Sequence, residues 1–144
     1  MATLFEQRNY VHIWATVIKK RFGLSDVEML IVAEELCRQL LGRGYNVVFD
    51  FLNHTRDLRN RFRHIAEQLS VPCVIVYLDP PQEVIQTRQQ FHMGGIETEG
   101  RTKIPWEVVE TIRSEFQVPK AEGRIVRISG ETNIEVLVHA IKEN

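Results

Sequence analysis

Cysteine is scarce in this sequence, which contains two cysteines and five histidines in 144 residues. Cys37 and Cys73 both lie in apolar stretches, so we expect two buried thiols and neither a disulfide nor a catalytic thiol. The histidines show no paired metal-ligand spacing, and neither a Gly-x-Ser-x-Gly elbow nor a Cys/His pairing stands out. These absences argue against a zinc site and against covalent hydrolase chemistry.

An excess of charge of either sign is also absent, because 18 Lys and Arg face 19 Asp and Glu, for a formal net charge of −1. This balance argues against nucleic acid or an anionic membrane surface as a partner. No apolar run approaches the roughly 20 residues that span a bilayer, and residues 1–6 do not have the order of a signal peptide. We therefore expect one cytoplasmic domain over residues 1–144, with no membrane partner.

Apolar side chains recur at helical spacing in six segments, most of them bounded by a cap, a proline or a glycine. The expected helices start near Tyr10, Ser25, Thr55, Pro80, Pro105 and Thr132. Three short apolar runs without alternation predict strands that are buried on both faces of a parallel sheet. They are Tyr45–Phe51, Val71–Leu78 and Arg124–Ser129. The alternation predicts an α/β fold, a three-layer sandwich whose ligands bind at the carboxyl ends of the strands.

Asp50 is the first candidate site residue, because it follows the earliest of these strands together with Asn53 and Thr55. A carboxylate at this edge can orient a substrate hydroxyl or a magnesium ion. The alternative interpretation is a loop aspartate that caps the next helix. For Thr55, the cap of the following helix is the favoured interpretation.

Arginines supply the other candidates. Arg56, Arg59 and Arg63 share one helical face, which predicts either a shared anion site, with Arg59 as its preferred member, or a solvated basic face. Arg88 and Arg101 flank a polar, glycine-bearing stretch between Phe91 and Lys103 that we interpret as a lid. Two lid arginines could neutralise charge on transferring phosphates, although each could equally be an ordinary surface arginine.

A phosphate-binding loop requires Gly-x-x-x-x-Gly-Lys-Ser/Thr, and only residues 95–102 approach it. Arg101 replaces the lysine, two glutamates would repel phosphate, and no expected strand precedes the segment. We interpret this segment as a coincidence inside the lid.

Taken together, these segments resemble the AAA-type predicted kinases, a P-loop family related to zeta toxins and to the kinase part of polynucleotide kinases. The resemblance is carried by Gly44–Asp50, Asn53, Thr55, Arg59, Val71–Leu78, Pro81–Val84, Arg88, Ile104–Val109 and Phe116–Pro119. It implies transfer of the γ-phosphoryl group of ATP, with magnesium, to a hydroxyl of a small-molecule substrate or a nucleic acid end. It further implies that Asp50, Arg88 and Arg101 are catalytic and that Asn53, Thr55 and Arg59 bind the substrate.

The chain departs from this family at its beginning, where the family has a strand and the Walker A loop and this sequence is expected to have helices. We therefore expect a P-loop NTPase-like fold without its first strand, a sheet that is rearranged or swapped between chains, and a homodimer. Phosphoryl transfer should be impaired without the Walker A loop. A noncatalytic binding or assembly module on a degenerate kinase scaffold is the alternative function, and a nucleic-acid binder is the weakest.

Overall fold

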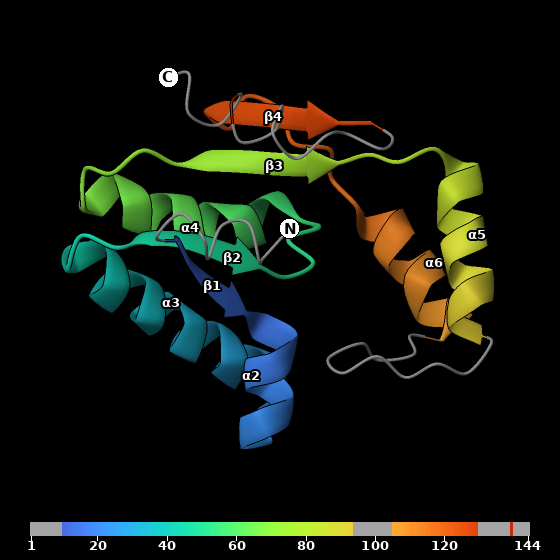
Figure 1. Cartoon of the computed structure of the whole chain (residues 1–144), viewed down its shortest axis with the longest axis horizontal. Coiled ribbons are helices and arrows are strands. Elements are labelled where there is room, and N and C mark those ends of the chain that lie inside the picture. The colour runs from blue at the N-terminus through green and yellow to red at the C-terminus, as the bar shows by residue number, and fades with distance from the viewer. Residues whose placement is uncertain (1–9, 94–104, 130–138, 140–144) are drawn as a thin grey trace. The chain divides into compact units, whose positions relative to one another are not determined.

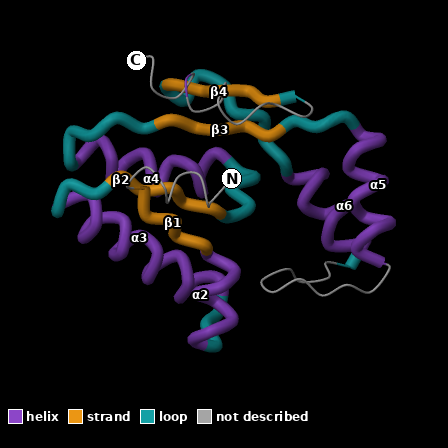
Figure 2. The backbone as a smooth tube through the Cα atoms, in the orientation of Figure 1, coloured by secondary structure: helices purple, strands orange, loops and turns teal. Residues whose placement is uncertain are grey.

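The computed structural model describes residues 10–93, 105–129 and 139, and the chain divides after Pro72 into two compact units (Figure 1). Each unit contains a sheet of two parallel strands together with helices (Figure 2). This mixture of helices with short parallel strands confirms the expected α/β fold class. The expected single domain over residues 1–144, and its three layers, stay predictions.

The first unit contains two strands and three helices. In chain order they are β1 (Tyr10–Trp14), α2 (Ala15–Phe22), α3 (Asp26–Gly42), β2 (Asn46–Asp50) and α4 (Arg56–Gln68). The strands β1 and β2 pair in parallel, and the register runs from Tyr10 opposite Asn46 to Trp14 opposite Asp50.

The prediction of a helix from Tyr10 was wrong over its first five residues, because residues 10–14 form β1. The expectation that the chain begins with helices and no preceding strand was therefore also wrong. The segment is rich in aromatic and β-branched residues, which favour a strand. In the strand Ile13 points into the core with 3% exposure, while His12 and Trp14 point to the opposite face. The helix begins only at Ala15, and it ends as expected at Gly23, whose φ of 63° is left-handed.

Local signals fix the other helix ends of this unit. Ser25 forms the predicted capping box, in which its hydroxyl accepts from the Glu28 amide at 3.2 Å and its own amide donates to the Glu28 carboxylate at 2.8 Å. Thr55 caps α4, since its Oγ1 accepts a hydrogen bond from the Leu58 amide at 3.3 Å. Both helices therefore begin where the sequence predicts.

The core of this unit lies where α3 packs against β1, β2, α2 and α4. Its buried residues are Ile13, Ala15, Met29, Leu30, Ala33, Cys37 and Ile65. Phe49 of β2 stacks on Phe62 of α4 with ring centroids 3.8 Å apart, which attaches α4 to the sheet. Burial raises the pKa of the Cys37 thiol to about 12, as expected for a core cysteine.

The second unit contains two strands and two helices. In chain order they are β3 (Val74–Leu78), α5 (Gln82–Met93), α6 (Trp106–Glu115) and β4 (Arg124–Ile128). The strands pair in parallel with Tyr77 opposite Arg127. Tyr77 stacks on Phe116 at 5.7 Å between ring centroids, and Arg127 forms an ion pair with Asp79. The two predicted strands of this unit, and the helices predicted from Pro80 and Pro105, are confirmed within a few residues at their ends.

Other predictions for this half of the chain have different outcomes. Cys73 is exposed just before β3, so the prediction that it is buried was wrong. The strand β3 begins at Val74 and does not include Cys73. The lid core at residues 94–104 lies outside the described residues, as does the expected last helix apart from His139.

Candidate functional site

The carboxyl edge of the β1–β2 sheet brings together a carboxylate, an imidazole and an indole. Asp50 ends β2 with a side chain that is 59% exposed, and Oδ2 lies 3.3 Å from Nε2 of His12. The His12 side chain is only 9% exposed, because it lies on β1 two residue pairs behind the edge. Trp14 is opposite Asp50 in the register and remains 36% exposed.

The ring of His12 also contacts Trp14. The two ring centroids lie 5.8 Å apart and the ring planes are 22° from parallel, a stacked arrangement. His12 therefore contacts both the carboxylate and the indole, and it restrains their positions relative to each other.

The loop from β2 to α4 is held by an arginine. Arg59 is 5% exposed, and its Nη1 donates a hydrogen bond of 2.9 Å to the backbone carbonyl oxygen of Asn53. Asn53 has a φ of 46°, in the left-handed region that asparagine tolerates better than most residues. Its side-chain Oδ1 is buried and has no hydrogen-bond partner in the part of the chain that the structure describes. The buried guanidinium therefore fixes the loop that follows Asp50.

The other arginines of α4 do not join Arg59. Arg56 is exposed, and Arg63 is half-buried with its Nη1 donating to Asn60 Oδ1 at 2.7 Å. Arg61 forms an ion pair with Glu34 of α3. Arg59 thus bonds the Asn53 carbonyl and Arg63 bonds Asn60, and a shared anion site stays a prediction.

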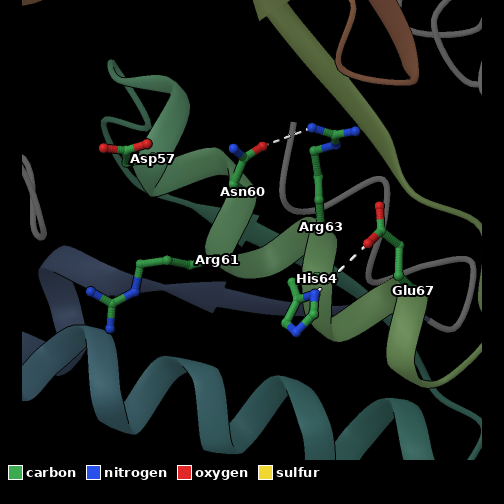
Figure 3. Close-up of a pocket in the computed structure, with 6 residues that line it drawn as sticks. All are labelled: Asp57, Asn60, Arg61, Arg63, His64 and Glu67. Atoms are coloured by element: carbon green, nitrogen blue, oxygen red, sulfur yellow. Dashed lines mark hydrogen bonds and ion pairs between the residues drawn. The ribbon is translucent and has the colours of Figure 1, made fainter.

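A hollow of about 500 Å³ lies beside α4 (Figure 3). Its lining residues come from that one helix and are Asp57, Asn60, Arg61, Arg63, His64 and Glu67. Figure 3 shows Asn60 joined to Arg63 and His64 joined to Glu67, the latter pair at 3.8 Å. Two acidic residues balance the two arginines, and Arg63 is the one arginine candidate among the lining residues, while Asp50, Asn53, Thr55 and Arg59 are not among them. We therefore place the candidate site at the strand edge.

Comparison with known proteins adds the family. A family model described as an AAA domain matches residues 4–119. This chain belongs to the AAA domain family. The family is of the P-loop NTPase type, which agrees with the mixed α/β fold and parallel strands. No curated protein matches this AAA domain.

The remaining predicted site residues of the AAA domain lie elsewhere. Arg88 is part of α5 in the second unit, where the position of its side chain is not described. Arg101 lies outside the described residues.

Within the described residues of the first unit, Asp50, Asn53, Thr55 and Arg59 lie in or next to the β2–α4 connection. Of these four, Thr55 and Arg59 already make bonds that hold the loop.

The AAA domain fits the implied ATP and magnesium only in part. Among the described residues no three or more His, Cys, Asp or Glu side chains gather in a metal-binding group. One carboxylate such as Asp50 can still hold a magnesium ion that substrate phosphates also bind. For the triphosphate, the sequence contains no glycine-rich loop with its lysine. Asp50 could therefore contribute to holding a magnesium ion, whereas the sequence has no glycine-rich loop to hold the triphosphate.

Sequence reasoning missed His12 and Trp14. Their segment was predicted to be helical, which would have placed both side chains away from Asp50. The available signal was the alternation of Tyr10, His12 and Trp14 with two β-branched residues.

In the described parts of the AAA domain, no helix has both the length and the apolar character that crossing a bilayer requires.

Proposed function

We propose that this AAA domain is kinase-like and related to ATP-dependent phosphotransferases that act on a hydroxyl of a small molecule or of a nucleic acid end. The observation that supports this proposal is the exposed Asp50 carboxylate at the carboxyl edge of parallel strands, with His12 at 3.3 Å. In open α/β sheets this edge is where ligands bind. The 144 residues on their own should transfer phosphate poorly, because the sequence contains no Walker A loop.

Asp50 has the position and chemistry of a residue that orients an acceptor hydroxyl. A hydrogen bond from His12 Nε2 would occupy one oxygen of the carboxylate and leave the other oxygen exposed to solvent. That second oxygen can accept the hydrogen bond of an alcohol and then its proton, as a general base does. The neighbouring Asn53 would bind the acceptor, while Thr55 and Arg59 keep the loop in place.

The donor side of the proposed reaction depends on groups beyond this edge. ATP with magnesium would supply the phosphoryl group and neutralise its charge when bound. Arg88 and Arg101 are proposed to stabilise that charge, as guanidinium groups do in other phosphoryl transfers.

The first experiment is calorimetric titration of the purified chain with magnesium-ATP, with its mass measured by light scattering. Saturable binding would support a phosphate site that is rebuilt or shared between chains. Absence of binding would favour the alternative, a noncatalytic binding or assembly module on a kinase scaffold. A mass twice that of the 16.8 kDa chain would support the proposed homodimer.

Where transfer to a hydroxyl is measurable, Asp50→Asn should lower its rate by about 100-fold or more, since general base catalysis contributes 10²–10⁴-fold. Asp57→Asn is the matched control, because Asp57 is an exposed acid in the first turn of α4. Equal rates in both variants would refute the role of Asp50.

A further inference from the structure

The carboxyl edge of β1–β2 holds an exposed aromatic ring beside the proposed acceptor carboxylate. Trp14 and Asp50 are register partners on a parallel sheet. Their side chains therefore leave the same face of the sheet at the same height. A molecule that binds Asp50 from solvent is therefore placed next to the indole.

The indole is held in place from one side. His12 precedes it on the same face of the strand and stacks on it, with ring centroids 5.8 Å apart and planes 22° from parallel. The imidazole is itself fixed, because its side chain is 9% exposed and its Nε2 lies 3.3 Å from Asp50 Oδ2. Trp14 is thus an ordered platform before any ligand binds.

The exposed part of Trp14 suggests what it binds. Tryptophan is usually well buried, yet this indole is 36% exposed beside a charged group. A restrained aromatic ring next to a hydrogen-bond acceptor is the combination that recognises a base by stacking and a hydroxyl by hydrogen bonding. The net charge of −1 agrees with a small neutral ligand better than with a polyanion.

We propose that this edge binds a nucleoside, whose base stacks on Trp14 and whose sugar hydroxyl donates a hydrogen bond to Asp50. The inference rests on the proposed function only in naming that hydroxyl as the phosphoryl acceptor. Binding of the nucleoside itself requires neither ATP nor magnesium.

Tryptophan fluorescence tests the stacking directly. The chain has two tryptophans, so Trp106→Phe leaves Trp14 as the sole indole. Inosine should quench its emission saturably, and ribose should not. Calorimetry then compares variants: Trp14→Ala should weaken inosine binding by about 5- to 150-fold, the usual effect of removing a stacking ring. Trp14→Phe keeps an aromatic face and should bind within about threefold of the parent.

Asp50→Asn tests the second contact, and its amide oxygen can still accept a hydrogen bond from His12, which supports the platform. It should weaken inosine binding and leave the binding of hypoxanthine, which has no sugar hydroxyl, unchanged. Circular dichroism shows whether Trp14→Ala folds. If it does not fold, Asp50→Asn still tests the proposal.

Three results would overturn the inference: ribose binding as tightly as inosine, unchanged inosine affinity in folded Trp14→Ala, or loss of inosine binding in saturating magnesium-ATP. The last would place the base in a donor site. Failure of the proposed function gives a different pattern, in which inosine binds through Trp14 and no phosphate is transferred. Transfer to a hydroxyl without any inosine binding would retain the function and refute the nucleoside.

Discussion

The two units of the chain are each built on a two-stranded parallel sheet, and they differ in how deeply their side chains are buried. Around β1–β2, seven residues from one strand and three helices form a buried core. Around β3–β4, Ile128 and Glu122 are the buried residues among those described. On β3 the first four residues are half-buried and Leu78 is exposed, and Arg127 pairs with Asp79 in contact with solvent.

This difference indicates where the free energy of unfolding comes from. Burial contributes roughly 25 cal/mol per Å² of apolar surface removed from water, whereas exposed ion pairs contribute about 0–1 kcal/mol each. We therefore expect the unit around β1–β2 to be the more stable one. The candidate site lies on that unit, so its geometry should be kept even when the other unit is perturbed.

The largest expected contrast is in thiol reactivity. The pKa of Cys37 is raised from 9.0 to about 12 by burial and by the charge of Glu34, which reduces its thiolate about a thousandfold at neutral pH. Cys73 is exposed. A thiol reagent such as a disulfide dye should label Cys73 at least 100-fold faster than Cys37 in the native protein. In denaturant the two rates should become similar, and comparable native rates would show that the core opens readily.

Core truncation gives the next largest effect. Met29→Ala should lower the free energy of unfolding by about 2–5 kcal/mol, because Met29 is completely buried. Ile75→Ala on the half-buried β3 should cost about half as much or less. Denaturant titration measures both. Ile31→Ala, at a position 57% exposed on α3, is the surface control. Equal losses for Met29 and Ile75 would contradict the contrast between the units.

Removal of the buried guanidinium should have an intermediate effect. Arg59→Ala deletes the hydrogen bond to the Asn53 carbonyl and should destabilise the protein by about 2 kcal/mol. The matched variant Arg61→Ala breaks an exposed ion pair with Glu34 and should cost less than about 1 kcal/mol. Equal losses of stability in the two variants would show that the buried hydrogen bond of Arg59 contributes no more than an exposed ion pair.

The smallest effect is expected in the second unit, at Tyr77. Burial, then the charge of Asp79 and a hydrogen bond to it, raise the pKa of the Tyr77 phenol above its ordinary value of 10.0. Because the folded pKa exceeds the unfolded one, the associated stability is complete below about pH 10 and is lost as the pH rises through the folded value. Asp79→Asn should lower the pKa of Tyr77.

The phenolate absorbance measures this shift, and subtraction of the titration of Tyr77→Phe isolates the one phenol. Asp57→Asn in the first unit serves as the control for a general change in charge. A pKa of Tyr77 that does not fall in Asp79→Asn would show that the carboxylate has no influence on it.

Local signals allowed much of the fold to be predicted. Ser25 and Thr55 cap helices through bonds to residues three positions later, and Gly23 ends α2 in a left-handed conformation, so sequence neighbours alone decide these features. The strand β1 could not be assigned in this way. Its apolar residues fit both a helix and a strand, and the decisive partner, β2, lies 36 residues further along the chain.

The candidate site, too, could be predicted from the sequence only in part. The apolar run around Asp50 predicts a strand over Tyr45–Phe51, and β2 ends within one residue of that prediction, at Asp50. The contact of Asp50 with His12 required the parallel register. The burial of Arg59 required the left-handed turn at Asn53, which brings a carbonyl oxygen to its guanidinium.

The parallel pairing of β1 with β2 also has a consequence for the order of folding. Parallel neighbours need a long crossover connection, and here it consists of α2 and α3. The strands that pair are therefore far apart in the sequence, which makes formation of the sheet slower than that of a hairpin. All its parts precede residue 73, so during synthesis this unit can acquire its core and its candidate site before the ribosome has completed β4.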